Sequence, residues 1–184
     1  MAQIEANPRG IPMAPFVGKV EEFTPESELE STLKKFQEMI AKYKYMEGHL
    51  LQRKKSLESK IPDIKKTLDM VQFLISQEDS TDPIITQYEL NDTLYARAEI
   101  KSGNKTVYLW LGANVMLEYS TPEASDLLTQ KLASARTSLE QVDEDLEFLR
   151  DQITTMEVNT ARVYNYDVKL RRARKDAGGG VEKE

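Results

Sequence analysis

Two long segments of the chain repeat apolar residues at alternating intervals of four and three positions. In the first segment, from Leu29 to Ile75, twelve of fourteen such positions are apolar; in the second, from Leu128 to Leu170, eleven of thirteen are apolar. This spacing keeps one seam facing a partner helix over its whole length, which is the condition for a coiled coil. Each segment spans about 50 residues, so each predicted helix is about 75 Å long. We expect the two seams to zip together as one antiparallel hairpin.

Residues 84–121, between the two segments, lose this repeat. Four short runs there are rich in Tyr, Val, Ile, Thr and Leu, as strands are: residues 86–90, 94–100, 106–111 and 115–119. The residues that separate them, 91–93, 102–105 and 112–114, contain Asn, Asp, Ser and Gly, which favour turns. The sequence therefore predicts a mainly α protein with a small β part, in which two β-hairpins join a long antiparallel two-helix coiled coil.

The predicted segments have these bounds: a flexible N-terminal arm at 1–25, a first helix at 26–82, the hairpins at 83–121, a second helix at 122–174 and a disordered tail at 175–184. Thr24 before Pro25 is expected to cap the first helix, and Thr121 before Pro122 the second. Pro62 falls inside the first helix, but the heptad frame runs through it, so we expect a kinked and continuous helix.

The arm combines a high proline density with scattered apolar residues. Pro8, Pro12, Pro15 and Pro25 block helix formation over this stretch. One interpretation is a disordered tail. The other is an arm that docks on a partner or on the coiled coil.

The hairpins carry more apolar residues than two isolated hairpins can bury. Such hairpins are marginal in water, so we expect their strands to pair or pack with other chains. The residues predicted for subunit assembly are Leu94, Tyr95, Ile100, Val107, Leu109, Trp110, Leu111, Val115, Leu117 and Tyr119.

Charge gives a separate indication of the helical pairing. Residues 53–66 carry a net charge of +4 and residues 136–151 a net charge of −4. If the pairing begins at residues 78 and 123, partner numbers add to about 201 and the two blocks face each other. Lys54 would then lie near Glu147, and Asp167 near Lys34. The alternative is that both blocks are solvated faces.

Composition narrows the class of protein. The net charge of −6 argues against nucleic-acid binding, which favours a basic face. The chain has no cysteine, no stretch of 18 apolar residues and no secretory signal pattern at its start, so we expect a soluble intracellular protein that does not enter membranes.

Residue patterns of enzymes are missing from the sequence. His49 is the only histidine, too few for a metal site or a histidine-based triad, and Gly178-Gly179-Gly180 lacks the lysine and serine of a phosphate loop. The carboxylates of residues 140–151 are better explained as a solvated or paired helix face. We expect no catalysis and no cofactor.

The open end of the helical hairpin offers a candidate binding surface. Its predicted members come from the start of the first helix and the end of the second: Leu29, Leu33, Phe36, Ile40, Val163, Tyr164, Tyr166 and Leu170. A two-helix coil frays at its open end, and frayed apolar residues make an adaptable surface. The alternative is ordinary seam packing with surface tyrosines.

Six segments resemble a known family. They read GIP at 10–12 with FV at 16–17, KYKYME at 42–47, IPDIK at 61–65, LWLGANVMLEY at 109–119, FLRDQ at 148–152 and EVNTARVYN at 157–165. Together they resemble prefoldin, in its alpha type, which carries two β-hairpins between its helices instead of one. The resemblance covers about residues 10–172.

The resemblance implies a hetero-hexamer of two alpha-type and four beta-type subunits, whose hairpins join into a β-barrel body. It implies capture of unfolded actin, tubulin and other chains at the coiled-coil tips, and their transfer without ATP to the cytosolic chaperonin. The location expected is cytoplasmic, with a nuclear location as a second option. The competing hypothesis from the residues is a structural coiled-coil adaptor or tether without such activity.

Overall fold

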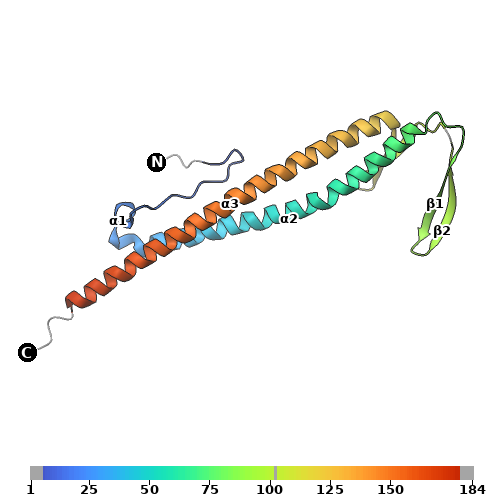
Figure 1. Ribbon diagram of the computed structural model, residues 1–184. Coiled ribbons are helices and arrows are strands. Elements are labelled where there is room, and N and C mark those ends of the chain that lie inside the picture. Colours follow the sequence, from blue (N-terminus) through green and yellow to red (C-terminus); the bar gives the residue numbers. More distant parts are fainter. Residues whose placement is uncertain (1–5, 102, 179–184) are drawn as a thin grey trace, which may run out of the picture. The chain divides into compact units, whose positions relative to one another are not determined.

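The computed structural model describes residues 6–101 and 103–178, with side chains to residue 175. It divides into two compact units, one formed by Met1–Lys55 with Glu140–Glu184 and the other by Ser56–Leu139. The elements follow in the order α1 (Val20–Phe23), a 3₁₀ turn (Glu26–Glu28), α2 (Leu29–Ser76), β1 (Ile84–Asn91), β2 (Leu94–Ile100), β3 (Thr106–Gly112), β4 (Val115–Ser120) and α3 (Thr121–Gly178) (Figure 1).

Helix α2 is continuous through Pro62, as the heptad frame predicts. It ends at Ser76, six residues before the predicted bound. The amide of Gln77 donates to both the Phe73 and Leu74 carbonyls at 3.2 Å, and the amide of Glu78 donates to the Ile75 carbonyl at 3.1 Å. The bonds to the Leu74 and Ile75 carbonyls span three residues instead of four, which tightens the end of the helix and closes it.

The predicted start of this helix needs a correction. Thr24 does not cap it; its hydroxyl is buried and lies 3.1 Å from the Thr32 hydroxyl. Pro25 instead precedes the 3₁₀ turn at Glu26–Glu28, whose first bond runs from the amide of Glu28 to the Pro25 carbonyl.

Helix α3 begins with a cap one residue earlier than predicted. Ser120, not Thr121, is the capping residue: its amide and hydroxyl both donate to Glu123 Oε2, at 3.1 and 2.7 Å, and its hydroxyl accepts from the Glu123 amide at 3.4 Å. This reciprocal pattern is a capping box. The helix runs to Gly178, past the predicted end at Arg174, because residues 175–177 contain no proline or glycine. The rest of the predicted tail, 179–184, lies outside the described residues.

Each unit has its own apolar cluster. In the first unit, the α2 seam from Leu29 to Tyr43 meets the α3 seam from Leu149 to Val163. In the second unit, Leu68 and Val71 of α2 pack with residues 124–132 of α3 and with Leu109 of β3. The predicted seams therefore form the core of both units.

The strands form two separate two-stranded antiparallel sheets, β1 with β2 and β3 with β4. Both sheets carry a bulge beside the turn, at Glu89–Asn91 and at Trp110–Gly112. Ala113 and Asn114 connect β3 to β4 with φ angles of 48° and 61°. Two consecutive positive φ angles are typical of a type I′ turn, which matches the twist of a hairpin.

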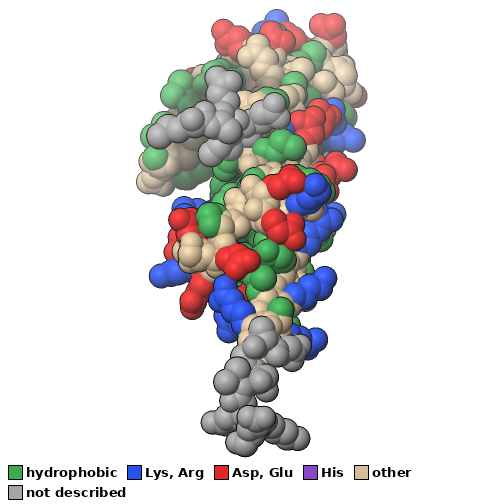
Figure 2. Space-filling model, turned by 90° about the vertical axis from the view of Figure 1, so that its left-hand side faces the viewer, with side chains coloured by type: hydrophobic (Ala, Val, Ile, Leu, Met, Phe, Trp, Pro, Cys, Tyr) green, Lys and Arg blue, Asp and Glu red, His purple; other side chains and the backbone are tan. Residues whose placement is uncertain are grey.

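Charges of both signs are interspersed on the face that Figure 2 shows, which fits a chain with only a modest net charge of −6. None of the helices among the described residues carries an apolar stretch long enough to cross a bilayer.

Candidate functional site

The N-terminal arm lies along α3 in the first unit (Figure 1). Residues 6–23 follow the interpretation of an arm that docks on the coiled coil and not that of a disordered tail, because four arm residues join the apolar cluster of the two helices: Ile11, Ala14, Val17 and Val20. Ile11, Ala14 and Val17 follow at intervals of three residues, which is one turn of an extended, proline-compatible chain, and Val20 begins α1. The first five residues of the predicted arm lie outside the described residues.

Two amide side chains of α3 hold the backbone of the arm. Gln152 Oε1 accepts from the Ala14 amide at 2.8 Å. Asn159 makes two bonds: its Oδ1 accepts from the Val17 amide at 3.1 Å, and its Nδ2 donates to the Pro15 carbonyl at 2.6 Å. Asn159 is fully buried, so these bonds replace the water that both atoms would otherwise bind. The contacts recognise main-chain groups and carry little information about side chains.

Two further side chains fix the middle of the arm. Arg162 donates to the Val17 carbonyl at 2.6 Å, and its guanidinium lies 5.2 Å from the centre of the Phe16 ring. From α2, the Tyr43 hydroxyl donates to the Pro12 carbonyl at 3.0 Å. Burial raises the pKa of Tyr43, which keeps the hydroxyl protonated as a donor. We call Tyr43, Gln152, Asn159 and Arg162 the arm site.

A turn at residues 7–10 anchors the beginning of the arm. Gly10 has a φ of +84°, which favours glycine, and its amide donates to the Asn7 carbonyl at 2.9 Å. The turn directs Arg9 at Asp145 of α3, with 2.6 Å between Nε and Oδ1, and at Glu144, with 2.8 Å between Nη2 and Oε2. Asn7 Nδ2 also donates to Asp145 at 2.7 Å. Two acidic residues that sequence analysis assigned to a solvated or helix-paired face therefore bind the arm.

Three of the residues that hold the arm share one heptad position of α3. Asp145, Gln152 and Asn159 are buried, polar and spaced by seven residues. Sequence analysis missed them, although two signals were present. One was this polar repeat beside the apolar seam, and the other was the three-residue apolar repeat of the arm.

The eight residues predicted for an open, frayed end are mostly packed. Leu29, Phe36 and Val163 are buried, and Leu33, Ile40, Tyr166 and Leu170 pack against the same cluster; only Tyr164 is exposed, at 58%. Phe23 adds a ring contact with Phe36 at 5.9 Å between centroids. The alternative of ordinary seam packing with a surface tyrosine describes this end, because the arm and α1 cover the seam.

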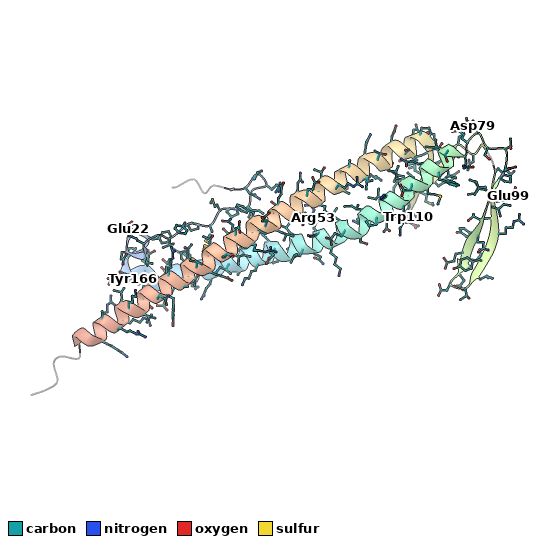
Figure 3. The ribbon with its side chains drawn as sticks, viewed as in Figure 1. Glu22, Arg53, Asp79, Glu99, Trp110 and Tyr166 are labelled. Atoms are coloured by element: carbon teal, nitrogen blue, oxygen red, sulfur yellow. The ribbon has the colours of Figure 1, made fainter. Side chains whose placement is uncertain are left out.

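Tyr166 shows how close α1 comes to this end. Tyr166 and Glu22 of α1 are both labelled at this end in Figure 3, and Tyr166 lines one hollow with Val20 and Glu21. Burial, followed by the charges of Glu21 and Glu26, raises the pKa of Tyr166. The carboxylates disfavour a phenolate there, so the hydroxyl stays neutral.

Exposed apolar side chains remain in this unit outside the seam. They include Met13, Phe16, Tyr45, Val158 and Tyr164. Beside the arm, an open apolar hollow of about 550 Å³ is lined by Pro12, Met39, Ala41, Lys42, Tyr43, Tyr45 and Met46. Methionine and tyrosine make such a surface adaptable to different occupants.

The helical register agrees with the predicted one at some pairs. Lys44 pairs with Glu157 at 3.3 Å, and their numbers add to the predicted 201. Lys54 pairs at 2.7 Å with Asp143, which lies one helical turn from the predicted Glu147. Asp167 pairs within its own helix with Arg171, at 2.8 Å, and not with Lys34.

The first hairpin has one mainly apolar face and one mixed face. Because side chains alternate along a strand, Ile84, Thr86 and Tyr88 of β1 share a face with β2 residues of the same pairing: Leu94, Ala96, Ala98 and Ile100. The opposite face carries Gln87, Glu89, Arg97 and Glu99 together with the exposed Ile85 and Tyr95. Tyr88 and Leu94 are exposed although they belong to the apolar face.

The predicted assembly residues of the second hairpin fall into a buried group and an exposed group. Leu109 is buried and Val107 and Tyr119 are half-buried in the unit's own cluster, so these three support the fold of the chain itself. Trp110 (labelled in Figure 3), Leu111, Val115 and Leu117 are exposed, Trp110 at 60%. Ile85, Tyr88, Leu90, Tyr108 and Met116 are also exposed, and the prediction missed them. Strand alternation around the turns could have found them.

A helical hairpin interrupted by two exposed β-hairpins is the arrangement that the resemblance implied. The family model described as "Prefoldin: Prefoldin subunit" matches residues 43–166. The chain belongs to the prefoldin family. Curated prefoldin relatives extend the match into the arm, because they cover most of the chain.

Three of these relatives show how far the similarity reaches. Prefoldin subunit 3 of Elsinoe fawcettii is 57% identical over 95% of this chain and 88% of the relative. The probable prefoldin subunit 3 of Schizosaccharomyces pombe is 58% identical over 92% of this chain and 98% of the relative. The human prefoldin subunit 3 is 48% identical over 88% of this chain and 83% of the relative.

A solved structure supports the same fold. It is the cryo-EM structure of filamentous PFD from Methanocaldococcus jannaschii, with a TM-score of 0.52 and 13% sequence identity. The match covers 67% of this chain and 98% of that chain. At this identity the likeness establishes the prefoldin fold.

Proposed function

We propose that this chain is an alpha-type subunit of a cytoplasmic prefoldin co-chaperone, assembled with one other alpha-type and four beta-type subunits. The observation that carries the proposal is the contrast between its parts: the helices bury their seams within the chain, whereas both hairpins leave apolar side chains exposed. Each hairpin also has two unpaired strand edges, which are templates for strands of other chains. Neighbouring prefoldin subunits would cover both.

The proposed activity is the capture of unfolded actin, tubulin and other chains and their transfer to the cytosolic chaperonin. Candidate contacts are the exposed apolar residues of the first unit, above all Tyr45, Val158 and Tyr164, with the hollow beside the arm. Each such contact is weak. Several subunits acting together supply affinity through effective concentration and still release the client readily.

Assembly is tested by native mass spectrometry of the chain, alone and mixed with the other five prefoldin subunits. A six-chain species with one copy of this chain supports the proposal. A homodimer that ignores those subunits would favour a structural adaptor and contradict it.

Client capture is tested by replacing Tyr45, Val158 and Tyr164 together with Ser and measuring suppression of the aggregation of diluted, urea-unfolded actin. Assembly should persist, because these side chains are exposed, while capture weakens. Replacing Phe36 and Val163 would be uninformative, because both are buried in the helical seam. Unchanged capture would exclude these three residues as the client surface.

A further inference from the structure

We propose that the arm site is a binding site for an extended apolar peptide, that the chain's own arm occupies it, and that an unfolded client segment displaces the arm. The inference rests on the proposed client-binding function and adds to it a site and a means of regulation. The arm site is outside the eight open-end residues that sequence analysis selected.

The geometry of the arm defines the ligand. Gln152 and Asn159, seven residues apart on α3, bind the amides of Ala14 and Val17, three residues apart in the arm. Seven helical residues advance about 10.5 Å. Three residues of a polyproline II chain advance about 9.3 Å. One heptad of α3 therefore matches one three-residue repeat of an extended chain that runs in the same direction.

The recognition is directed at the main chain. Asn159 binds one amide and one carbonyl of the arm, Gln152 binds an amide, and Tyr43 and Arg162 bind carbonyls. Amide and carbonyl groups are common to every peptide. The side-chain requirement is small or branched apolar residues at every third position, as Ile11, Ala14, Val17 and Val20 provide. Many unfolded segments contain such a stretch.

The chemistry of the site requires an occupant with free main-chain groups. Buried polar atoms of Asn159 and Gln152 are satisfied by the arm, so an occupant that leaves must be replaced by water or by another peptide. Two open hollows also border the arm, one of about 550 Å³ beside Pro12 and one of about 470 Å³ beside Gly18 and Val20. A client segment with larger side chains finds space at both positions.

The arm is then an intramolecular competitor. Its anchor at Arg9 keeps it at high local concentration. The apparent affinity for a client equals the intrinsic affinity multiplied by the fraction of time that the site is free. The covered site avoids exposing an apolar strip before a client arrives.

The test compares complexes that carry wild-type chain, Val17→Asp, Met13→Asp or the double variant Val17→Asp with Asn159→Leu. Val17 is buried on α3, whereas Met13 is half exposed in the same arm, so Met13→Asp is the matched control. Hydrogen exchange at the amides of Ala14 and Val17 reports whether the arm has left. Fluorescence anisotropy reports binding of labelled, urea-unfolded actin to each complex.

We expect Val17→Asp to accelerate exchange at Ala14 and to tighten actin binding about tenfold if the arm covers the site ninety per cent of the time, that is, if the free fraction is about 0.1. Met13→Asp should change neither measurement. Asn159→Leu should abolish the gain, because it removes two main-chain bonds. If exchange accelerates while actin affinity stays at the wild-type value, the inference is overturned and the proposed function survives.

A second measurement covers the case in which Val17→Asp leaves the arm bound. A labelled synthetic peptide of residues 7–20 is titrated into the complex whose copy of this chain lacks residues 1–22. Binding there, and much weaker binding to the wild-type complex, is expected. No binding to the shortened chain overturns the arm site. If actin binds no complex at all, wild type included, the proposed function fails while the peptide titration still reports on the site.

Discussion

The two units of this chain differ in how far their apolar side chains are buried. In the first, two helical seams and an arm from the far end of the sequence cover one another, and polar side chains of α3 satisfy the arm's backbone. In the second, only Leu109 among the strand residues is buried, and Trp110 and Leu117 remain exposed. The first unit buries its helical seams within the chain and leaves apolar side chains exposed only beside them, whereas the hairpins leave most of their apolar side chains uncovered. The comparison separates the part that folds from the part that assembles.

This difference also weighs on the adaptor hypothesis. A structural coiled coil needs exposed seam residues to recruit a second coil, but the seam from Leu29 to Tyr43 is already paired with α3. An exposed two-stranded sheet with one mainly apolar face, as in β1 and β2, is better suited to joining a larger sheet. The fold therefore directs association to the hairpins.

The largest effect should come from charging the apolar face of the first hairpin. We expect Tyr88→Asp with Leu94→Asp to abolish the six-chain species in native mass spectrometry. Burying an unpaired carboxylate in a subunit interface costs several kcal/mol. The circular dichroism of the free chain should stay unchanged, because both positions are exposed in it.

The opposite face of the same hairpin supplies the control. Gln87 pairs across the strands with Arg97, so Gln87→Asp adds a charge beside a cation and should leave assembly intact. Assembly of the Tyr88 and Leu94 variant at wild-type yield would show that this face is not buried in the complex.

A smaller effect is expected from two matched side-chain truncations, one in each unit. Leu149 is fully buried in the helical cluster, and Leu149→Ala should lower the free energy of unfolding of the free chain by about 2–5 kcal/mol. Leu117 is 47% exposed, and Leu117→Ala should change it by less than about 0.5 kcal/mol. Urea unfolding followed by circular dichroism measures both.

In the six-chain complex, Leu117→Ala should have a larger effect than it has in the free chain. The truncation should lower the melting temperature of the six-chain assembly, because the side chain becomes part of an interface. If Leu117→Ala destabilises the free chain as much as Leu149→Ala, the hairpin is already packed and the contrast between the units fails.

Sequence predicted the parts of this structure that follow from local periodicity. The seams of α2 and α3 repeat over many heptads, and the four strands are bounded by turn residues, so both could be found from neighbouring residues alone. The arm could not. Its order depends on Val17 meeting Asn159, which is 142 positions away, and a proline-rich stretch has the composition of a disordered one. The open-end prediction failed for the same reason, since it left the arm out.

The smallest effect lies at the joint where β4 becomes α3. The Ser120 hydroxyl and then the Ser120 amide donate to Glu123 and lower the pKa of its carboxyl from the ordinary 4.5. The folded state therefore favours the carboxylate. Its contribution to stability is fully present above the ordinary pKa and is lost as the pH falls through the lowered one.

Ser120→Ala removes the hydroxyl donor, so the carbon-13 NMR titration of Glu123 should move its pKa back toward 4.5. Glu123→Gln should reduce the loss of stability between about pH 5 and pH 3, because the titrating group is gone. A Glu123 pKa that stays unchanged in Ser120→Ala would mean that the capping box does not form in solution. Helix α3 would then begin without the cap that sets the boundary between β4, whose apolar side chains are exposed, and the helix.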